Sequence, residues 1–260
     1  ISQQINEAGD LEAWKAVYRT LVYWELELEE AKTGMDDMLK QQKAEANNLF
    51  CRYIRKQYLG WIDKPDNKPF MSPDVFKQTV FPLLDADETV FFILIDNFRF
   101  DQWQVIKRLL GDRFSINEDL YTSILPTATQ YARNAIFSGL MPLKIQAMFP
   151  ELWVDENEEE GKNLNESPLI QTQLDRYRKR YAFSYNKINN NQAGERFMGK
   201  VKGLLNTPLN VVVFNFIDML SHARTESKMI RELANTEAAY RSLTESWYKH
   251  SAISELLDFL

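Results

Sequence analysis

Two apolar runs decide the fold: Thr89-Val-Phe-Phe-Ile-Leu-Ile-Asp96 and Leu209-Asn-Val-Val-Val-Phe-Asn-Phe-Ile-Asp218. Both are short and rich in β-branched and aromatic residues, which is typical of strands buried on both faces. Helical patterns lie between and after them, and strands that alternate with helices indicate a mostly parallel sheet. The sequence therefore predicts an α/β fold with a mostly parallel sheet flanked by helices.

Apolar spacing also predicts the helices that surround these strands. The expected helical ranges are 74–81, 100–111, 127–138, 168–180, 196–206 and 223–260. Two polar stretches, the acidic 155–167 and the asparagine-rich 186–194, are interpreted as exposed insertions.

The first 66 residues have a different character. Residues 10–31 and 35–61 each show the apolar face of an amphipathic helix, and the short connection at Gly34 predicts an antiparallel helical hairpin. The stretch 63–73 holds three prolines and no periodicity, so it is interpreted as a linker. We expect a helical module at 1–66 and an α/β domain at 72–260.

Composition excludes several classes of protein. The chain has 260 residues, of which 45% are apolar, and a net charge of −6, which argues against a generic basic surface for nucleic acid. The single cysteine, Cys51, excludes a disulfide framework and a cysteine-rich zinc site, and it suits a reducing compartment such as the cytoplasm. No apolar run reaches 18 residues, so no membrane span is expected.

Each apolar run leads into an aspartate. If the strands are parallel, Asp96 and Asp218 share the edge of the sheet where ligands bind in open α/β folds. Two carboxylates in one crevice repel each other unless a cation lies between them. His222 follows Asp218 by one helical turn, and Asp with His is a donor set that suits zinc. The alternative is that each aspartate only caps the helix that follows.

A third segment brings a hydroxyl group. Pro126 predicts a helix start, with Thr127 and Thr129 in its first turn. A helix N-terminus offers free amides and partial positive charge, which suits a phosphate. A threonine hydroxyl becomes a nucleophile only when a base or a cation activates it. The alternative is plain helix capping by a threonine.

These residues together carry a resemblance. The matching stretches are Ile95-Asp-Asn-Phe-Arg-Phe-Asp-Gln-Trp103, Leu125-Pro-Thr-Ala-Thr-Gln-Tyr-Ala-Arg-Asn134 and Asn215-Phe-Ile-Asp-Met-Leu-Ser-His-Ala-Arg-Thr-Glu226. The set resembles the PglZ branch of the alkaline phosphatase superfamily, and more closely the response regulators of Bacteroidetes that are tied to type IX secretion. The helical hairpin resembles the module that joins a receiver domain to the PglZ domain in those proteins.

The resemblance implies an activity and a set of roles. The superfamily hydrolyses phosphate esters with two zinc ions and a Thr or Ser nucleophile. By position, Thr129 is similar to the nucleophile, which also contacts metal, and Asp96 resembles the ligand after the first strand. Asp218 and His222 resemble the pair that holds the other ion. The implied groups for substrate binding are Arg99, Asp101, Arg133 and Asn134.

The sequence departs from the family pattern in one respect. Superfamily members carry a further Asp-His-Gly motif and a later histidine, whereas the only other histidine here, His250, lies in an expected helix and lacks the context of a strand end. We therefore expect the sequence to be part of a longer protein whose remaining metal ligands lie beyond Leu260. The metal also stays open at this point, because Mn²⁺ suits mixed Asp and His ligands as well as Zn²⁺ does.

Two functions follow as hypotheses. The first is a zinc-dependent phosphodiesterase that acts on nucleotide or oligonucleotide diesters, controlled by a cognate histidine kinase through a receiver domain before Ile1, with the hairpin relaying the signal through contacts in a homodimer. The second is a non-catalytic module with a phosphatase-like fold, which contacts a sigma factor or a secretion component through the hairpin or the acidic 155–160 loop.

Overall fold

The computed structural model describes residues 1–31, 34–64, 68–154 and 163–260. The described residues form two compact units, each assembled from segments that are distant in sequence. One unit contains residues 1–69, 99–120 and 234–245, and the other contains residues 70–98, 121–233 and 246–260. The predicted boundary between 1–66 and 72–260 stays a prediction, and residues 65–67 of the predicted linker lie outside the described part.

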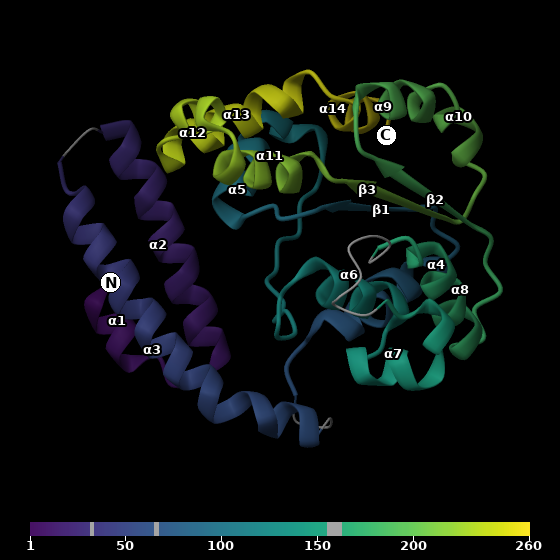
Figure 1. The fold of residues 1–260 in the computed structure, drawn as a ribbon, viewed down its shortest axis with the longest axis horizontal. Helices are drawn as coiled ribbons and strands as arrows, with labels where there is room; N and C mark the ends of the chain where they lie inside the picture. Colours follow the sequence, from purple (N-terminus) through teal and green to yellow (C-terminus); the bar gives the residue numbers. More distant parts are fainter. Residues whose placement is uncertain (32–33, 65–67, 155–162) are drawn as a thin grey trace. The chain divides into compact units, whose positions relative to one another are not determined.

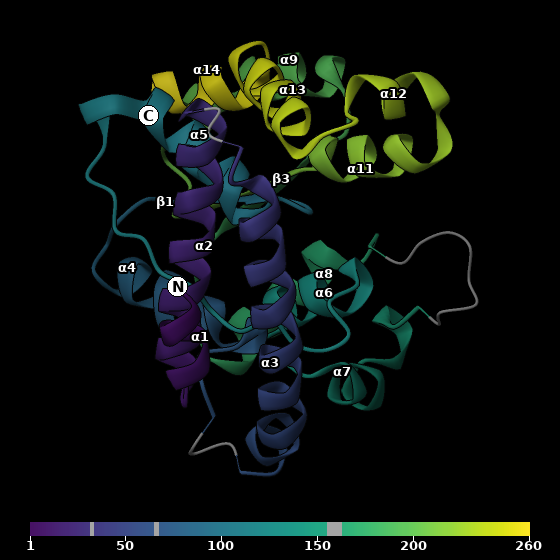
Figure 2. The same cartoon turned by 90° about the vertical axis from the view of Figure 1, so that its left-hand side faces the viewer.

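The first unit is built on helices α1 (Ser2–Glu7), α2 (Leu11–Ala31) and α3 (Asp36–Asp63), and α2 and α3 run side by side (Figures 1 and 2). Trp14, Val17 and Leu21 of α2 are buried against Leu39 and Ala46 of α3. Their spacing places them on one helix face. The expected hairpin is therefore present, with the predicted helices displaced by no more than two residues at either end.

Further segments complete the first unit. They contribute α5 (Phe100–Leu110), a short 3-10 turn η4 (Gly111–Arg113), and the first part of α13 (Glu237–Lys249). The Asp101 carboxylate joins these helices, because it accepts a hydrogen bond of 2.8 Å from Arg241 of α13 and one of 2.9 Å from Arg99. Arg241 also pairs with Glu25 and Glu29 of α2.

The second unit holds a parallel sheet of three strands within the described residues. The strands are β1 (Val90–Ile95), β2 (Phe183–Ile188) and β3 (Leu209–Phe214), in the order β1-β3-β2. The central strand β3 is fully buried, whereas β1 at the edge is half-buried along its length. Asn210 lies in the buried strand, and its amide group bonds the carbonyls of Leu204 and Thr207 at 2.9 Å.

Helices cover both faces of this sheet (Figures 1 and 2). On one face lie α4 (Phe81–Asp85), α6 (Thr129–Ser138) and α8 (Glu166–Arg176), and on the other lie α9 (Asn191–Met198) and α14 (Ala252–Phe259). The core under α4, α6 and α8 includes Phe76, Phe137 and Leu169, all with 0% exposure. Burying each such side chain contributes roughly 1.5–3 kcal/mol.

The remaining elements of this unit are short. They are η2 (Ser72–Asp74), the π-helical turn η3 (Phe76–Val80), α7 (Pro142–Met148), η5 (Pro150–Leu152), α10 (Val201–Leu204), α11 (Phe216–Glu226) and α12 (Lys228–Leu233). The fold class predicted from the sequence, an α/β fold with a parallel sheet flanked by helices and preceded by a helical region, is confirmed.

Two local predictions were wrong, and a third was wrong in its last residues. The range 186–194 is not an insertion, because it contains the end of β2 and the start of α9. Of the range 155–167, residues 155–162 lie outside the described part, but Glu166 begins α8 and is fully buried. The expected helix 223–260 is instead divided among α11, α12, α13 and α14.

Candidate functional site

The carboxyl edge of the sheet positions the candidate site. Because all three strands are parallel, their last residues lie side by side, and Ile95 and Ile188 are both in register with Phe214. The next residue after each strand is polar: Asp96, Asn189 and Asn215. The Asp96 amide still donates to the Phe214 carbonyl at 2.9 Å, so the backbone holds this aspartate at the rim.

Thr129 reaches the same rim from α6. It is the first residue of that helix and is half-buried, and its Oγ1 lies 3.5 Å from Asp96 Oδ2. The first amides of a helix have no partner within the helix, so this end carries partial positive charge. Thr127, the other threonine of the predicted first turn, precedes the helix and is exposed.

Arg133 follows Thr129 by one helical turn and links three elements. Its Nη1 donates to Asp96 Oδ2 at 2.7 Å and to Asn215 Oδ1 at 3.1 Å, while its Nε donates to Glu166 Oε1 at 2.7 Å. The guanidinium is 4% exposed. Burial alone would lower the pKa of Arg133, but the carboxylates of Glu166 and Asp96 outweigh it and raise that pKa. The residue therefore stays a cation.

Glu166 anchors this network from α8. Its side chain has no exposure, and the Tyr185 hydroxyl of β2 donates to it. Lys187 of the same strand lies 3.9 Å from it. Burial, followed by the charge of Glu166, raises the pKa of Tyr185, so the phenol remains protonated and donates. A buried carboxylate needs such partners because an unpaired buried charge is strongly unfavourable.

Asp218 and His222 form a pair on α11. His222 Nε2 lies 3.7 Å from Asp218 Oδ2, and the imidazole is largely exposed, with 70% of its side-chain surface accessible. Burial, and then the negative charge of Asp96, raise the pKa of Asp218. The negative charge of Asp96 thus disfavours the ionised form of Asp218.

The secondary structure that leads to Asp218 differs from the prediction. We expected a strand running straight into it, but β3 ends at Phe214 and Asp218 lies in the first turn of α11. The continuous apolar run concealed the change, because Phe216 and Ile217 already belong to the helix. The residue directly after the strand is Asn215, which bonds both Arg133 and Asn189.

Two predicted substrate groups have other contacts. Arg99 and Asp101 bond each other and belong to the first unit, where Asp101 also binds Arg241. Asn134 lies next to Arg133 on α6 and is 5% exposed. The structure therefore places Asp96 in contact with both Thr129 and Arg133, and the charge of Asp96 influences the pKa of Asp218.

Sequence reasoning missed Glu166, Asn215 and Lys187. Glu166 stands in an acidic, asparagine-rich stretch, and nothing in that pattern marks one glutamate as buried. Asn215 could have been found, because polar residues that follow buried parallel strands are candidates for a site.

The donor types suit a divalent cation. Two carboxylates, an imidazole and a hydroxyl are oxygen and nitrogen ligands that Zn²⁺ and Mn²⁺ accept. The acidic side chains of this region outnumber the basic ones. They are Asp96, Glu166 and Asp218, and the basic side chains are Arg133 and Lys187. In the part of the chain that the structure describes, however, no group of three or more His, Cys, Asp or Glu side chains is arranged to hold a metal.

A parallel sheet flanked by helices is consistent with an alkaline phosphatase-like domain. Residues 75–260 match the family described as BREX system PglZ alkaline phosphatase-like domain, and the chain belongs to that family. Residues 1–62 match the PorX response regulator linker domain, as the resemblance of the helical hairpin indicated. The combination is that of a PorX-like regulator. No curated protein matches the chain.

Among the described residues, none of the helices combines the length and the apolar character needed to cross a membrane.

Proposed function

We propose that the rim of the sheet is the active site of a metal-dependent phosphodiesterase, with Thr129 as its nucleophile. The observation that carries this proposal is the position of the Thr129 hydroxyl, 3.5 Å from Asp96 at the start of α6 and one turn before Arg133. A hydroxyl beside a carboxylate can act as an activated nucleophile, and a cation and helix amides can stabilise the charge that develops in an in-line attack on a phosphate ester.

Two pairs of residues would hold the cations. Asp96 with Thr129 would contribute to one site and Asp218 with His222 to the other, and Zn²⁺ is the ion we propose, with Mn²⁺ as the alternative. Bound divalent ions supply positive charge that lowers the pKa of a coordinated hydroxyl or water and stabilises the developing phosphate charge. Each pair supplies only half of a tetrahedral set, so further donors must complete it.

The residues of this chain support the following steps. Thr129 Oγ1 loses its proton, for which Asp96 Oδ2 is the nearest acceptor, and attacks the phosphorus of a diester. The new bond between oxygen and phosphorus forms as the bond to one of the two ester oxygens breaks; that oxygen takes up the proton lost by Thr129 and leaves as the alcohol, while the phosphate stays on Thr129 with its second ester group. Water then attacks the phosphorus of this threonine-linked diester, the bond to Thr129 Oγ1 breaks, and a phosphomonoester is released while one proton of the water restores the hydroxyl. The α6 amides stabilise the charge on the phosphate oxygens.

We also propose a role for the whole protein in signalling. We place the domain in a cytoplasmic two-component system that controls type IX secretion, with a histidine kinase acting through a receiver domain and a homodimer relaying the signal through the hairpin. The match of residues 1–62 to a response-regulator linker supports this role. Nucleotide or oligonucleotide diesters are the proposed substrates.

A second candidate is a binding module without turnover. Its support is that the described residues contain no ready group of three metal-binding side chains, and that Arg133 already neutralises Asp96. Such a module would contact a sigma factor or a secretion component. The acidic loop 155–160, one of its predicted contact segments, lies outside the described residues.

The test compares two threonines in the natural protein that carries this sequence. Bis(p-nitrophenyl) phosphate is the substrate, and the variants are Thr129→Val and, as the matched control, Thr127→Val. We expect the first to lose at least roughly 100-fold in kcat and the second to retain activity, with the fold of both checked by circular dichroism. EDTA should abolish wild-type turnover, and the ion that restores it identifies the metal. Equal activity of both variants would remove Thr129 from its role.

A further inference from the structure

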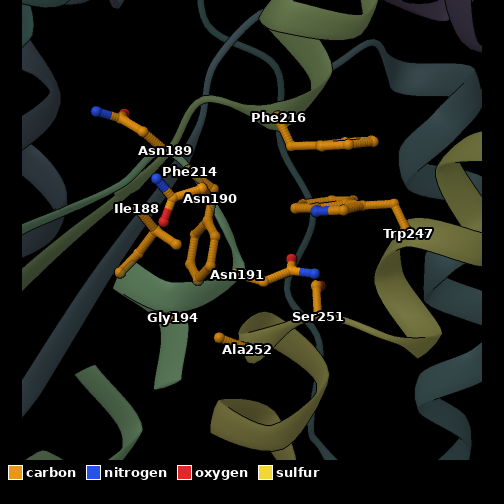
Figure 3. Close-up of a pocket in the computed structure, with 10 residues that line it drawn as sticks. All are labelled: Ile188, Asn189, Asn190, Asn191, Gly194, Phe214, Phe216, Trp247, Ser251 and Ala252. Atoms are coloured by element: carbon orange, nitrogen blue, oxygen red, sulfur yellow. The ribbon is translucent and has the colours of Figure 1, made fainter. Parts of the chain in front are cut away.

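A small pocket opens beside the candidate site, at the ends of β2 and β3. Ile188 and Phe214, the last residues of these strands, form part of its wall together with Gly194 and Ala252 (Figure 3). Its volume is about 30 Å³, which is space for roughly two water molecules. A ring-shaped ligand would therefore insert only one edge, and most of its surface would stay outside.

An aromatic pair forms another wall of this pocket. The rings of Phe216 and Trp247 are stacked, with an interplanar angle of 4° and centroids 5.3 Å apart, and Figure 3 shows them face to face. Phe216 is 37% exposed although it is large and apolar. A rigid aromatic surface that remains open to solvent is suited to flat, π-rich ligands.

Three consecutive asparagines complete the lining: Asn189, Asn190 and Asn191, all of which are exposed. The side-chain oxygens of Asn189 and Asn190 already accept hydrogen bonds of 2.9 Å from Asn215 and from the Ala193 amide, but the amide group of an asparagine also carries two donors. Ser251 is the remaining polar residue of the pocket, and no charged side chain of the described residues lines it. The lining therefore suits an uncharged ring with hydrogen-bonding edges better than a phosphate, an amine or an aliphatic chain.

A short chain of hydrogen bonds connects this pocket to the rim. Asn189 accepts a hydrogen bond of 2.9 Å from Asn215, and Asn215 accepts one of 3.1 Å from Arg133. Only one asparagine side chain thus separates the pocket from the buried arginine that holds Asp96. The pocket therefore borders the hydrogen-bond network that holds Asp96.

We propose that the pocket lined by Asn189–Asn191, Phe216 and Trp247 binds the nucleobase of the ligand, and that it is the reason for a preference for nucleotides over simple phosphate esters. This inference rests on the proposed function for the position of the phosphate. The base packs against the aromatic pair, and the asparagine amides bond its edge.

The test is calorimetric titration of the natural protein with thymidine 5′-monophosphate and with deoxyribose 5-phosphate, which has the same sugar phosphate without a base. We expect the nucleotide to bind about tenfold tighter, which is within the range for one stacked base. Phe216→Leu keeps the apolar bulk and should remove this difference while leaving the affinity for deoxyribose 5-phosphate unchanged. Leu205→Ala, another exposed apolar position of the same unit, is the matched control and should keep the difference.

Asn191→Ala gives a second, independent variant at an exposed position. It should reduce the preference for the nucleotide about threefold, the loss of one hydrogen bond. If the wild-type protein binds the two ligands equally, or if neither Phe216→Leu nor Asn191→Ala changes their ratio, the inference is wrong. Equal binding together with intact diester hydrolysis overturns only the base pocket, whereas base-dependent binding without any hydrolysis overturns only the proposed activity.

Discussion

Replacing Glu166 with glutamine tests the buried network that orients the site. The substitution keeps the shape of the side chain but removes the charge that faces Arg133 at 2.5 Å and 2.7 Å. It also makes the NH₂ group of the new amide, a hydrogen-bond donor, face another donor, either the guanidinium or the Tyr185 hydroxyl. Glu166 has no exposed side-chain surface, so water cannot compensate for the loss.

The expected loss of unfolding free energy follows from these contacts. Removing one partner of a buried ion pair costs about 3–5 kcal/mol of unfolding free energy. Arg133 keeps Asp96 and Asn215 as partners, so the lower end of that range, about 3 kcal/mol, is expected. For a chain of this size the midpoint of thermal unfolding should fall by roughly 6–12 °C.

The assay is urea denaturation followed by circular dichroism, with a thermal scan alongside it. Glu151→Gln makes the same chemical change at an exposed position, and it should shift the unfolding free energy by less than about 0.5 kcal/mol. If Glu166→Gln is as stable as Glu151→Gln, then Glu166 is not the buried anchor of Arg133 and the account of the network fails.

Two further predictions concern other parts of the chain. Burial raises the pKa of Asp101, but the hydrogen bond from Arg241 and the charge of Arg99 outweigh it and hold that pKa below its usual value. The stability that this ionised group contributes is therefore fully present above its unfolded pKa, about 3.9, and is lost as the pH falls through the lower folded pKa. Urea denaturation should show Asp101→Asn less stable than wild type by about 2 kcal/mol at pH 7, and a difference that persists undiminished at about pH 2 would contradict this. Gly139 ends α6 with φ +64°, and an added Cβ would clash with the side-chain amide of Gln173, so Gly139→Ala should cost about 1–3 kcal/mol. Gly203→Ala, where nothing lies within 4 Å of the added atom, should be neutral or slightly stabilising, and equal effects of the two substitutions would contradict the packing described for Gly139.

The sequence predicted most of the scaffold because its signals are local. The β-branched run of β3 and the apolar face of α2 are periodic patterns that a single segment reveals. Strand β2 was missed because Phe183-Ser-Tyr-Asn-Lys-Ile188 is half polar, and its place in the sheet depends on pairing with β3. Tertiary pairing, rather than intrinsic preference, makes that segment a strand.

In the candidate site, too, residues marked by local sequence signals could be predicted, and residues placed by tertiary packing could not. Asp96 and Thr129 follow recognisable element boundaries, and the structure places them in contact. Glu166 could not be predicted, because its burial results from α8 packing over the sheet, where Arg133 and Tyr185 meet it. The roles of Asp96, Thr129, Asp218 and His222 as metal and catalytic groups remain predictions.

The measurement that tests the central claim most directly is calorimetric titration of the natural protein with Zn²⁺, repeated with Mn²⁺. The chain has two histidines, and they provide a matched pair: His222 faces Asp218, whereas the His250 ring bonds the Ser246 carbonyl at 2.8 Å. We predict that His222→Ala weakens binding by at least about tenfold, as expected for loss of a ligand, and that His250→Ala leaves it unchanged. Equal affinities of the two variants, or no binding of either ion by the wild-type protein, would show that the rim of this sheet is not a cation site.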